Sequence, residues 1–287
     1  MRIRSLLLSF SLLTGCTSVP AISTEAPAAE PLPGLAYPNL ETAKAMPAPS
    51  AIARLLLSLP VHDVFASQEL RRRYLQGDVL VQEVHGQTGS KDYLVTDHEG
   101  AWYGFWVRSF HGTRPELTGY LVEVRGECAG LRGTDPAYAA PLAEAKRQCG
   151  VTGTRHFDSG LRAYRVVDGQ PPEDVTASIA PDPAVSSKAM LEHYASVGAS
   201  EVFALDDNLH QLPVFRWVVE FDPENTSTST DPPIFDGGHH AHAGFVVWDG
   251  ERFERRTTVP RALWPCRVSR PEECPPRSPY EDQFVID

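Results

Sequence analysis

The chain has 287 residues, of which 42% are hydrophobic and 9% aromatic, and its formal net charge is −11 at pH 7. This composition is typical of a folded protein. The acidic charge repels phosphate groups, which argues against nucleic acid and anionic lipid headgroups as partners of the folded part. It favours a cationic partner, although a solvated acidic surface accounts for the charge equally well.

The first sixteen residues have the pattern of a secretory leader. Arg2 and Arg4 precede an apolar run of about eight residues, far short of the roughly 20 that span a bilayer as a helix. The run ends in Leu13-Thr14-Gly15-Cys16, which resembles the lipobox of bacterial lipoproteins. The resemblance covers only this leader.

The lipobox resemblance implies that residues 1–15 are a signal peptide removed before Cys16. It also implies acylation of Cys16, as by palmitate, and two or more acyl chains form a stable membrane anchor. Thr17 stands where an Asp would imply retention at the inner membrane, so the resemblance implies an outer-membrane lipoprotein facing the periplasm. The alternatives are an ordinary signal peptide or a buried cysteine in an N-terminal helix.

The next segment, residues 16–50, is rich in proline and alanine and shows no period of 2 or 3.6. Such segments behave as semi-rigid spacers of up to ~3.1 Å per residue. We therefore expect a tether, or alternatively a proline-rich coat on the folded part. Residues 51–264 are expected to form one globular domain, followed by a proline-rich C-terminal segment at 265–287. Without the leader the chain has 24 basic against 37 acidic residues, a net charge of −13.

Four cysteines remain besides Cys16, and an even number in an exported protein predicts disulfide bonds. Three pairings are possible. We favour the sequential one, in which Cys128–Cys149 ties a strand end to the end of a helix and Cys266–Cys274 clips the C-terminal segment. The competing hypothesis is a structural zinc site, but the chain has no Cys-x-x-Cys pair.

Periodicity and turn residues place the secondary structure. Ser50 and Ser67 are expected to cap the first two helices, and Arg71-Arg72-Arg73 is expected to lie on a solvated helix face. Further helices are expected at about 141–148 and 186–197. Strands are expected at 78–84, 91–96, 101–108, 119–125, 162–167, 201–205, 213–221, 244–248 and 252–259.

The hairpin signals predict antiparallel pairing. Asp249-Gly250 lies between two apolar runs and predicts a tight turn with φ > 0 at both residues. Trp102 to Trp106 is apolar on both faces of a strand, which indicates a strand covered on both sides. We therefore expect an α+β fold, with antiparallel β-hairpins forming sheet, a few short helices and a disulfide-clipped C-terminal segment.

The histidines of His239-His240-Ala241-His242 are the strongest chemical signal. If a strand begins there, His240 and His242 share a face, as two ligands of a zinc or copper ion would. A third ligand would have to come from earlier in the chain, such as Asp236, His210 or His193, and sequence alone cannot place it. A solvated histidine loop is the simpler interpretation.

Known catalytic patterns are missing from the sequence. There is no Gly-x-Ser-x-Gly motif, no His-Glu-x-x-His motif, and no glutamate after His242 at the cupin spacing. Two hypotheses remain. The favoured one is a non-enzymatic lipoprotein that needs no cofactor and whose head binds a protein or envelope component, for instance as an inhibitor or immunity protein. The alternative is a metal-dependent protein or enzyme that uses the His239–His242 cluster.

Overall fold

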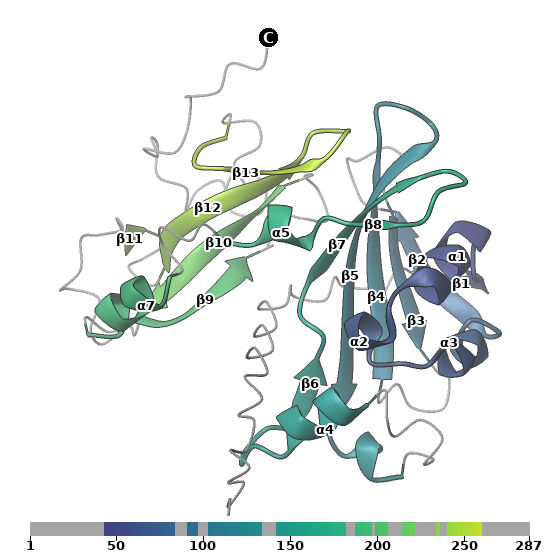
Figure 1. Ribbon diagram of the computed structural model, residues 1–287, viewed down its shortest axis with the longest axis horizontal. Helices are drawn as coiled ribbons and strands as arrows, with labels where there is room; N and C mark the ends of the chain where they lie inside the picture. Colours follow the sequence, from purple (N-terminus) through teal and green to yellow (C-terminus); the bar gives the residue numbers. More distant parts are fainter. Residues whose placement is uncertain are drawn as a thin grey trace, which may run out of the picture. The chain divides into compact units, whose positions relative to one another are not determined.

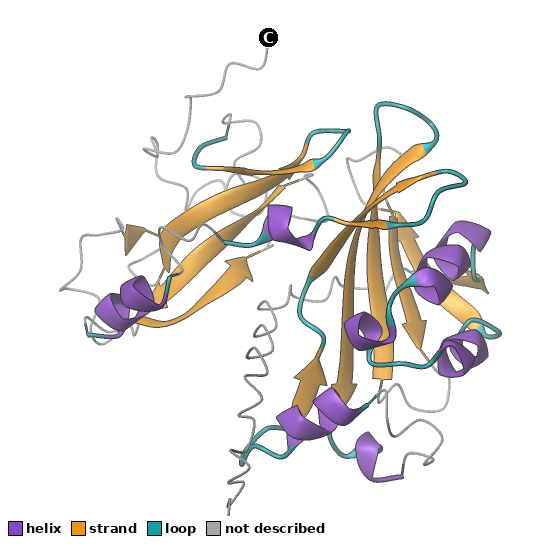
Figure 2. Ribbon diagram, in the orientation of Figure 1, coloured by secondary structure: helices purple, strands orange, loops and turns teal. Residues whose placement is uncertain are grey.

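The structure is a computed structural model. It describes residues 43–83, 91–96, 103–133, 142–181, 187–196, 199–205, 214–221, 234–235 and 240–259. All of them belong to one contact-defined unit, Pro31–Asp287. Strands predominate over short helices (Figure 2). The predicted α+β class with antiparallel sheet is therefore confirmed.

The larger sheet, sheet A, is antiparallel at every pairing among the described residues. Its main path runs through seven strands (Figure 1): β1 (Lys44–Pro47), β2 (Asp78–Glu83), β3 (Lys91–Thr96), β4 (Tyr103–His111), β5 (Leu117–Glu127), β7 (Arg162–Val167) and β8 (Glu173–Asp174). The short strand β6 (His156–Asp158) also pairs with β5. The expected strands at 91–96 and 162–167 have the predicted bounds.

The smaller sheet, sheet B, is built from the last third of the described chain. Its order is β11 (Ile234–Phe235), β12 (His240–Trp248), β10 (Val214–Phe221) and β9 (Ala199–Leu205), and β13 (Phe253–Arg256) also pairs with β12. All of these pairings are antiparallel.

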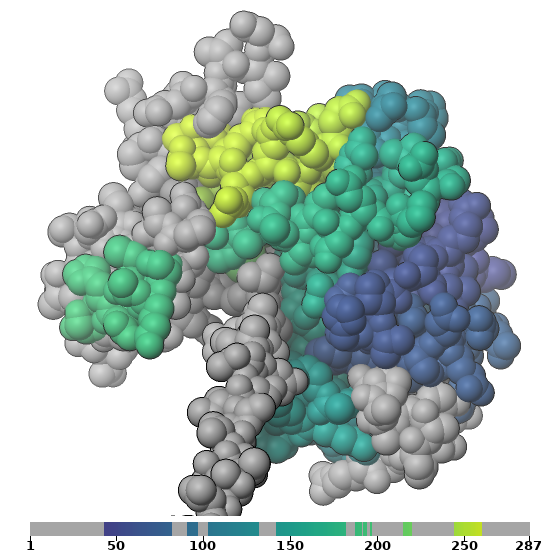
Figure 3. Space-filling model, in the orientation of Figure 1, coloured from purple at the N-terminus to yellow at the C-terminus, as the bar shows by residue number. Residues whose placement is uncertain are grey.

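The helices are short. They are α1 (Ser50–Ser58), α2 (Val61–Val64), α3 (Gln68–Tyr74), α4 (Ala143–Cys149), α5 (Thr176–Ile179) and α7 (Lys188–Ala195), with a 3₁₀ turn at Gly130–Gly133. The segment α1 to α3, in purple and blue, covers one face of sheet A (Figures 1 and 3). Ser67 caps α3 as predicted, because its Oγ accepts a hydrogen bond from the amide of Leu70 at 3.1 Å.

Two helix predictions were wrong. Ser50 is the first helical residue rather than the cap, and Pro49 occupies the cap position, where it has no amide hydrogen to satisfy. Of the three arginines expected on a solvated helix face, Arg72 and Arg73 are exposed as predicted, but Arg71 is only 1% exposed. Its Nη1 donates to the carbonyls of Leu56 and Leu59, and so satisfies backbone acceptors at the end of α1. Burial lowers the pKa of the Arg71 guanidinium from its usual value.

Two apolar cores lie on the two faces of sheet A. The helix-side core joins α1, α3 and α4 to residues that include Tyr103, Phe105 and Val107 of β4. The inter-sheet core joins Trp106 and Phe110 of β4 to sheet B. The prediction that β4 is covered on both sides is confirmed for its described residues, and Trp102 lies outside them.

The inter-sheet core is closely packed. A Cβ atom at Gly119 of β5 would lie 2.6 Å from the Trp248 ring of β12, so only glycine fits there. The indole nitrogens of Trp217 and Trp248 donate to the carbonyls of Ile179 and His111, at 2.7 and 2.8 Å. These bonds satisfy the polar ends of both rings within the core.

The predicted hairpin at Asp249-Gly250 is present, but its turn differs from the prediction. Trp248 pairs with Phe253, so the loop has four residues, 249–252, rather than the predicted two, and only Gly250 among them has a positive φ, of 95°. The Asp249 carboxylate instead accepts hydrogen bonds from the amides of Glu251 and Arg252 at 2.7 and 2.8 Å. The longer loop does not require a left-handed backbone at Asp249, and the Asp249 side chain stabilises the turn through these two bonds.

Candidate functional site

The predicted cysteine pair at the end of β5 is present. Cys128 and Cys149 form a disulfide with a Cα–Cα distance of 5.5 Å, which links the chain just after β5 to the end of α4. This prediction is confirmed. Cys16, Cys266 and Cys274 lie outside the described residues.

The predicted histidine pair lies at the start of a strand. β12 begins at His240, so His240 and His242 are its first and third residues and share one face of sheet B. His239, His210 and Asp236 lie outside the described residues, and His193 lies on α7 and is exposed. The side chains of His240 and His242 are not among those the structure describes.

The register of sheet B brings carboxylate residues to this histidine pair. His240 of β12 pairs with Glu220 of β10, and Glu220 pairs with Glu201 of β9. Directly opposed residues on neighbouring strands share a face. His240, Glu220 and Glu201 therefore form one row across three strands, which we call the acidic row.

Sequence reasoning did not find the two glutamates. Glu220 and Glu201 are some 20 and 40 residues from His240 in the chain, and only strand pairing brings them into one row. The one available signal was that Glu201 begins one predicted strand, 201–205, and Glu220 is the second-last residue of the next, 213–221. The pairing register depends on the lengths of the loops that join these strands, and the sequence alone did not give those lengths.

The face that carries the acidic row is the one turned away from the inter-sheet core. Trp217 and Val219 belong to that core, so the alternating positions Val218 and Glu220 lie on the other face of β10. Val218, which pairs with His242, is 0% exposed. The histidine pair therefore lies next to a fully buried position.

A β-bulge follows the histidine pair. The register between β10 and β12 shifts between Arg216 and Val218, because two residues of β12, Ala243 and Gly244, oppose the single residue Trp217 of β10 there. Gly244, with φ 112°, lies within this stretch of β12. A Cβ atom there would lie 3.8 Å from the carbonyl oxygen of Arg256, an ordinary contact distance. Bulges are frequent next to functional sites, where they redirect a strand.

A group of charged and polar side chains lies between α2 and strand β7 of sheet A. Asp63 is 2% exposed, and its carboxylate accepts a hydrogen bond from the Tyr164 hydroxyl at 2.9 Å and lies 2.8 Å from Nη1 of Arg162. His62 is largely exposed and places Nε2 3.1 Å from the same carboxylate. Burial, and then the Asp63 charge, raise the pKa of Tyr164 far above its usual value. This group attaches α2 to β7.

Sheet A also contains a buried ion pair. Nε and Nη2 of Arg108 donate to the two oxygens of Asp92, each at 2.5 Å, and both residues are 1% exposed or less. Glu123 of β5 is equally buried and accepts a hydrogen bond from Nε of Arg125 at 2.8 Å. A buried carboxylate is costly unless it is paired, and these two are paired within their own sheet.

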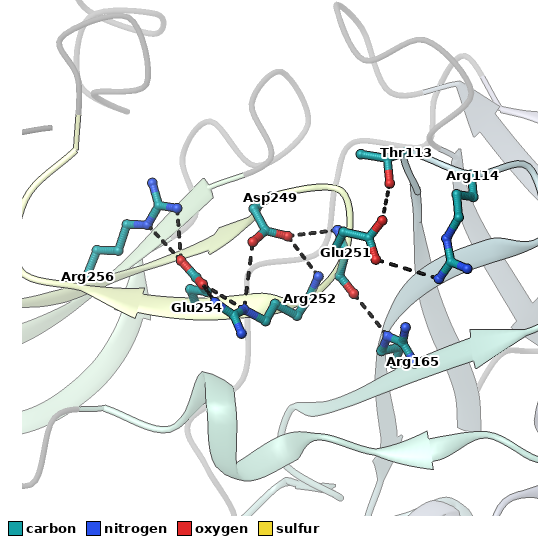
Figure 4. Close-up of polar contacts among 8 residues, drawn as sticks. All are labelled: Thr113, Arg114, Arg165, Asp249, Glu251, Arg252, Glu254 and Arg256. Carbon is teal, nitrogen blue, oxygen red and sulfur yellow. Dashed lines mark hydrogen bonds and ion pairs between the residues drawn. The ribbon is translucent and has the colours of Figure 1, made fainter. Parts of the chain in front are cut away.

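A surface network joins the turns of the two sheets (Figure 4). Glu251 accepts a hydrogen bond from the Thr113 hydroxyl and lies 3.6 Å from Arg114, and its backbone carbonyl accepts one from Arg165 at 3.0 Å. Along β13, Glu254 pairs with Arg256 at 2.9 Å. Hydrogen bonding to Arg256 is the main cause that lowers the pKa of Glu254. The network fixes the β12–β13 turn against sheet A.

The described part of the chain holds neither a cluster of metal ligands nor a membrane-spanning helix. No three His, Cys, Asp or Glu side chains gather there as a metal site would require. No helix described is long and apolar enough to cross a bilayer. The comparisons with known proteins give no identification either, because no family model, curated protein or solved structure matches the chain.

Proposed function

We propose that this chain is a lipid-anchored protein of the bacterial envelope, held through Cys16 at the outer membrane and facing the periplasm. The observation that carries the proposal is Leu13-Thr14-Gly15-Cys16 at the end of a short apolar run. The Cys128–Cys149 disulfide supports it, because disulfides persist in oxidising compartments such as the periplasm.

The anchor is tested on the full chain produced in a Gram-negative host. Mass spectrometry of the mature protein is expected to find an N-terminal residue 16 carrying fatty acid, and the protein in the membrane fraction. Cys16→Ser is expected to abolish both. The matched control is Cys128→Ser/Cys149→Ser, which removes two other cysteines and is expected to keep the fatty acid. An unmodified residue 16, or a retained leader, contradicts the proposal.

The proposed role of the folded head is non-enzymatic binding of a protein or envelope component. The net charge of −13 supports a cationic partner, because opposite charge accelerates encounter. One specific form is an inhibitor or immunity protein against a basic wall-degrading enzyme. A basic muramidase serves as the probe, and one equivalent of the protein is expected to slow its hydrolysis of cell walls.

Salt sharpens that test. Raising the ionic strength from 0.1 to 1 M shortens the Debye length from about 10 Å to about 3 Å. Association led by charge is therefore expected to slow at high salt. If the muramidase is not inhibited and no cationic envelope protein binds at either salt concentration, the binding role is wrong, whatever the outcome for the anchor.

A metal-dependent head is the second candidate function. The observation that favours it is that β12 begins at His240, which gives His240 and His242 the alternation that two ligands of one zinc or copper ion require.

A further inference from the structure

Exposed cations collect on the first elements that the structure describes. Residues 44–74, from β1 to α3, include five Lys or Arg residues against two acidic ones, in a chain whose net charge is −11. Four of the five cations are exposed, namely Lys44, Arg54, Arg72 and Arg73. Of the two acids, Asp63 is buried and Glu69 is exposed. We call the exposed side of this segment, purple and blue in Figure 3, the N-terminal surface.

The four exposed cations of the N-terminal surface have no ion-pair partner in the described part of the chain. The hydrogen bond that Nη2 of Arg72 donates goes to the neutral side chain of Gln68, at 3.1 Å. Exposed arginines elsewhere differ, because Arg114, Arg147 and Arg252 each lie beside a glutamate. The positive charge of the N-terminal surface is therefore left available to a partner.

The two longer helices of this segment present their cations on one outer side. Both α1 and α3 bury their apolar residues in the helix-side core, so their exposed arginines lie on the side turned away from sheet A. Nε2 of Gln68 in α3 donates a hydrogen bond to the Leu57 carbonyl of α1 at 3.2 Å, so the two helices adjoin. Their exposed sides thus belong to one surface.

Large apolar side chains are exposed in the same segment. Among the described residues, the large hydrophobic side chains that are exposed are Met46 of β1, at 42%, Val61 of α2, at 41%, and Val151. Two of these three therefore belong to the segment that carries the unpaired cations. Cations combined with exposed apolar side chains are typical of protein surfaces that lie on a layer of lipid headgroups.

We propose that the N-terminal surface contacts the anionic phospholipid headgroups of the membrane that holds the anchor. The proposal rests on the proposed lipid anchor and extends it by stating which side of the head faces the membrane. β1 is the first element that the structure describes, and residues 17–42 connect it to Cys16. At up to ~3.1 Å per residue, this connection keeps the surface within reach of the bilayer.

The negative net charge of the whole chain does not prevent this contact. Mobile ions screen charges that are farther apart than a Debye length, which is about 8 Å at physiological ionic strength. A membrane therefore responds mainly to the charges nearest to it, and those of the N-terminal surface are mostly positive. Each cation near an anionic membrane favours the bound state about fivefold. The expectation from net charge, that anionic lipid is disfavoured, then applies to the rest of the head.

Hydrogen exchange of the mature full-length protein on vesicles tests the proposal. Vesicles of phosphatidylcholine alone are compared with vesicles of an equal mixture of phosphatidylcholine and phosphatidylglycerol. Amides of α1 and α3 are expected to exchange about fivefold more slowly on the anionic vesicles, whereas amides of β13 are unchanged. In about 1 M salt the difference is expected to disappear, because the charges are then screened.

Two matched double variants separate the N-terminal surface from the other exposed cations. Arg72→Gln/Arg73→Gln is expected to weaken the contact about tenfold or more, which abolishes the slower exchange. The control is Lys146→Gln/Arg155→Gln, which removes two exposed cations that also form no ion pair with the described residues, and it is expected to retain the slower exchange. Circular dichroism of each variant checks that the fold is retained.

The outcomes distinguish this surface from the anchor. If the protein stays on both kinds of vesicle and α1 and α3 exchange equally on both, the surface contact is wrong and the anchor stands. If the protein stays only on anionic vesicles, and only while Arg72 and Arg73 are present, the anchor is wrong and the surface contact is supported. Equal effects of the two double variants overturn the assignment to this surface.

Discussion

Sheet A and sheet B differ in how they balance charge. In sheet A the buried carboxylates of Asp92 and Glu123 are each bound by an arginine of the same sheet. In sheet B the register positions of the acidic row hold one histidine and two glutamates, with no lysine or arginine among these three positions. The two buried carboxylates of sheet A thus have arginine partners in the same sheet, whereas the acidic row of sheet B contains two glutamates and one histidine.

The difference suggests separate roles for the two charge clusters. A buried pair such as Asp92–Arg108 is weak support for stability, but breaking it is costly because one charge is left without its partner. The acidic row lies on the face of sheet B turned away from the inter-sheet core, at positions given by strand register. Four predictions test this contrast, beginning with the largest expected effect.

Arg108→Leu is expected to destabilise the protein by removing one partner of the buried Asp92–Arg108 ion pair. It leaves the buried Asp92 carboxylate without its bidentate partner, and the expected loss is about 3–5 kcal/mol in the free energy of unfolding. Urea denaturation measures it. The double variant Asp92→Leu/Arg108→Leu removes both charges and is expected to be much closer to the parent protein. Equal losses in the single and double variants would contradict the pairing.

Zinc is expected to stabilise sheet B selectively. At a free concentration 100 times the dissociation constant, a ligand that binds only the folded state contributes about 2.7 kcal/mol. Hydrogen exchange is expected to slow at amides of β10 and β12, while locally exchanging amides of β3 and β4 change less. If zinc slowed hydrogen exchange equally in both sheets, the prediction that it stabilises sheet B selectively would be wrong.

Alkaline pH is expected to weaken the attachment of α2 to sheet A. The pKa of Tyr164 is raised in the folded state, so its contribution is complete below the usual tyrosine pKa of about 10 and is lost as the pH rises beyond it. The pKa of Tyr120 is likewise raised, to about 12, mainly by burial.

Tyr164→Phe isolates this effect. It removes the hydrogen bond to Asp63, with an expected loss of about 1.5–3 kcal/mol at neutral pH, and it flattens the alkaline decline in stability. Denaturation between pH 8 and 11 measures both effects, with absorbance reporting tyrosinate. An unchanged alkaline slope would assign the decline to other groups.

Glu251→Gln is expected to have the smallest effect. It weakens the exposed contact with Arg114, and exposed ion pairs contribute about 0–1 kcal/mol. The variant is compared with the parent at 0.05 and 1 M salt, where any difference is expected to shrink as charges are screened. A loss as large as that of Arg108→Leu would contradict the expectation that this exposed contact contributes little to stability.

Local patterns predicted much of the fold. The strand at 91–96 follows from a short β-branched and aromatic run, and the start of α3 follows from Ser67, whose hydroxyl caps it. The strand β1 was not predicted, because all four of its residues are exposed and it has no apolar face to produce a period. Arg71 was misplaced because its buried partners are backbone carbonyls, which no side-chain pattern records.

The candidate site was predicted only in part. His240 and His242 are visible as neighbours in sequence, whereas Glu220 joins them through a pairing decided by the whole sheet. A shift of one residue in that pairing would place Glu220 opposite another residue of β12. The register depends on inter-sheet packing at positions such as Trp217 and Trp248, and this tertiary contact is not encoded locally.

The position of β1 has a mechanical consequence. Among the strands that the structure describes, β1 is an edge strand of sheet A, and its four exposed residues pair with β2. A pull transmitted from the N-terminal side of the chain is therefore resisted first by the backbone hydrogen bonds between β1 and β2. These bonds can yield before a load reaches the helix-side core, so β1 would act as an extensible link at this edge of sheet A.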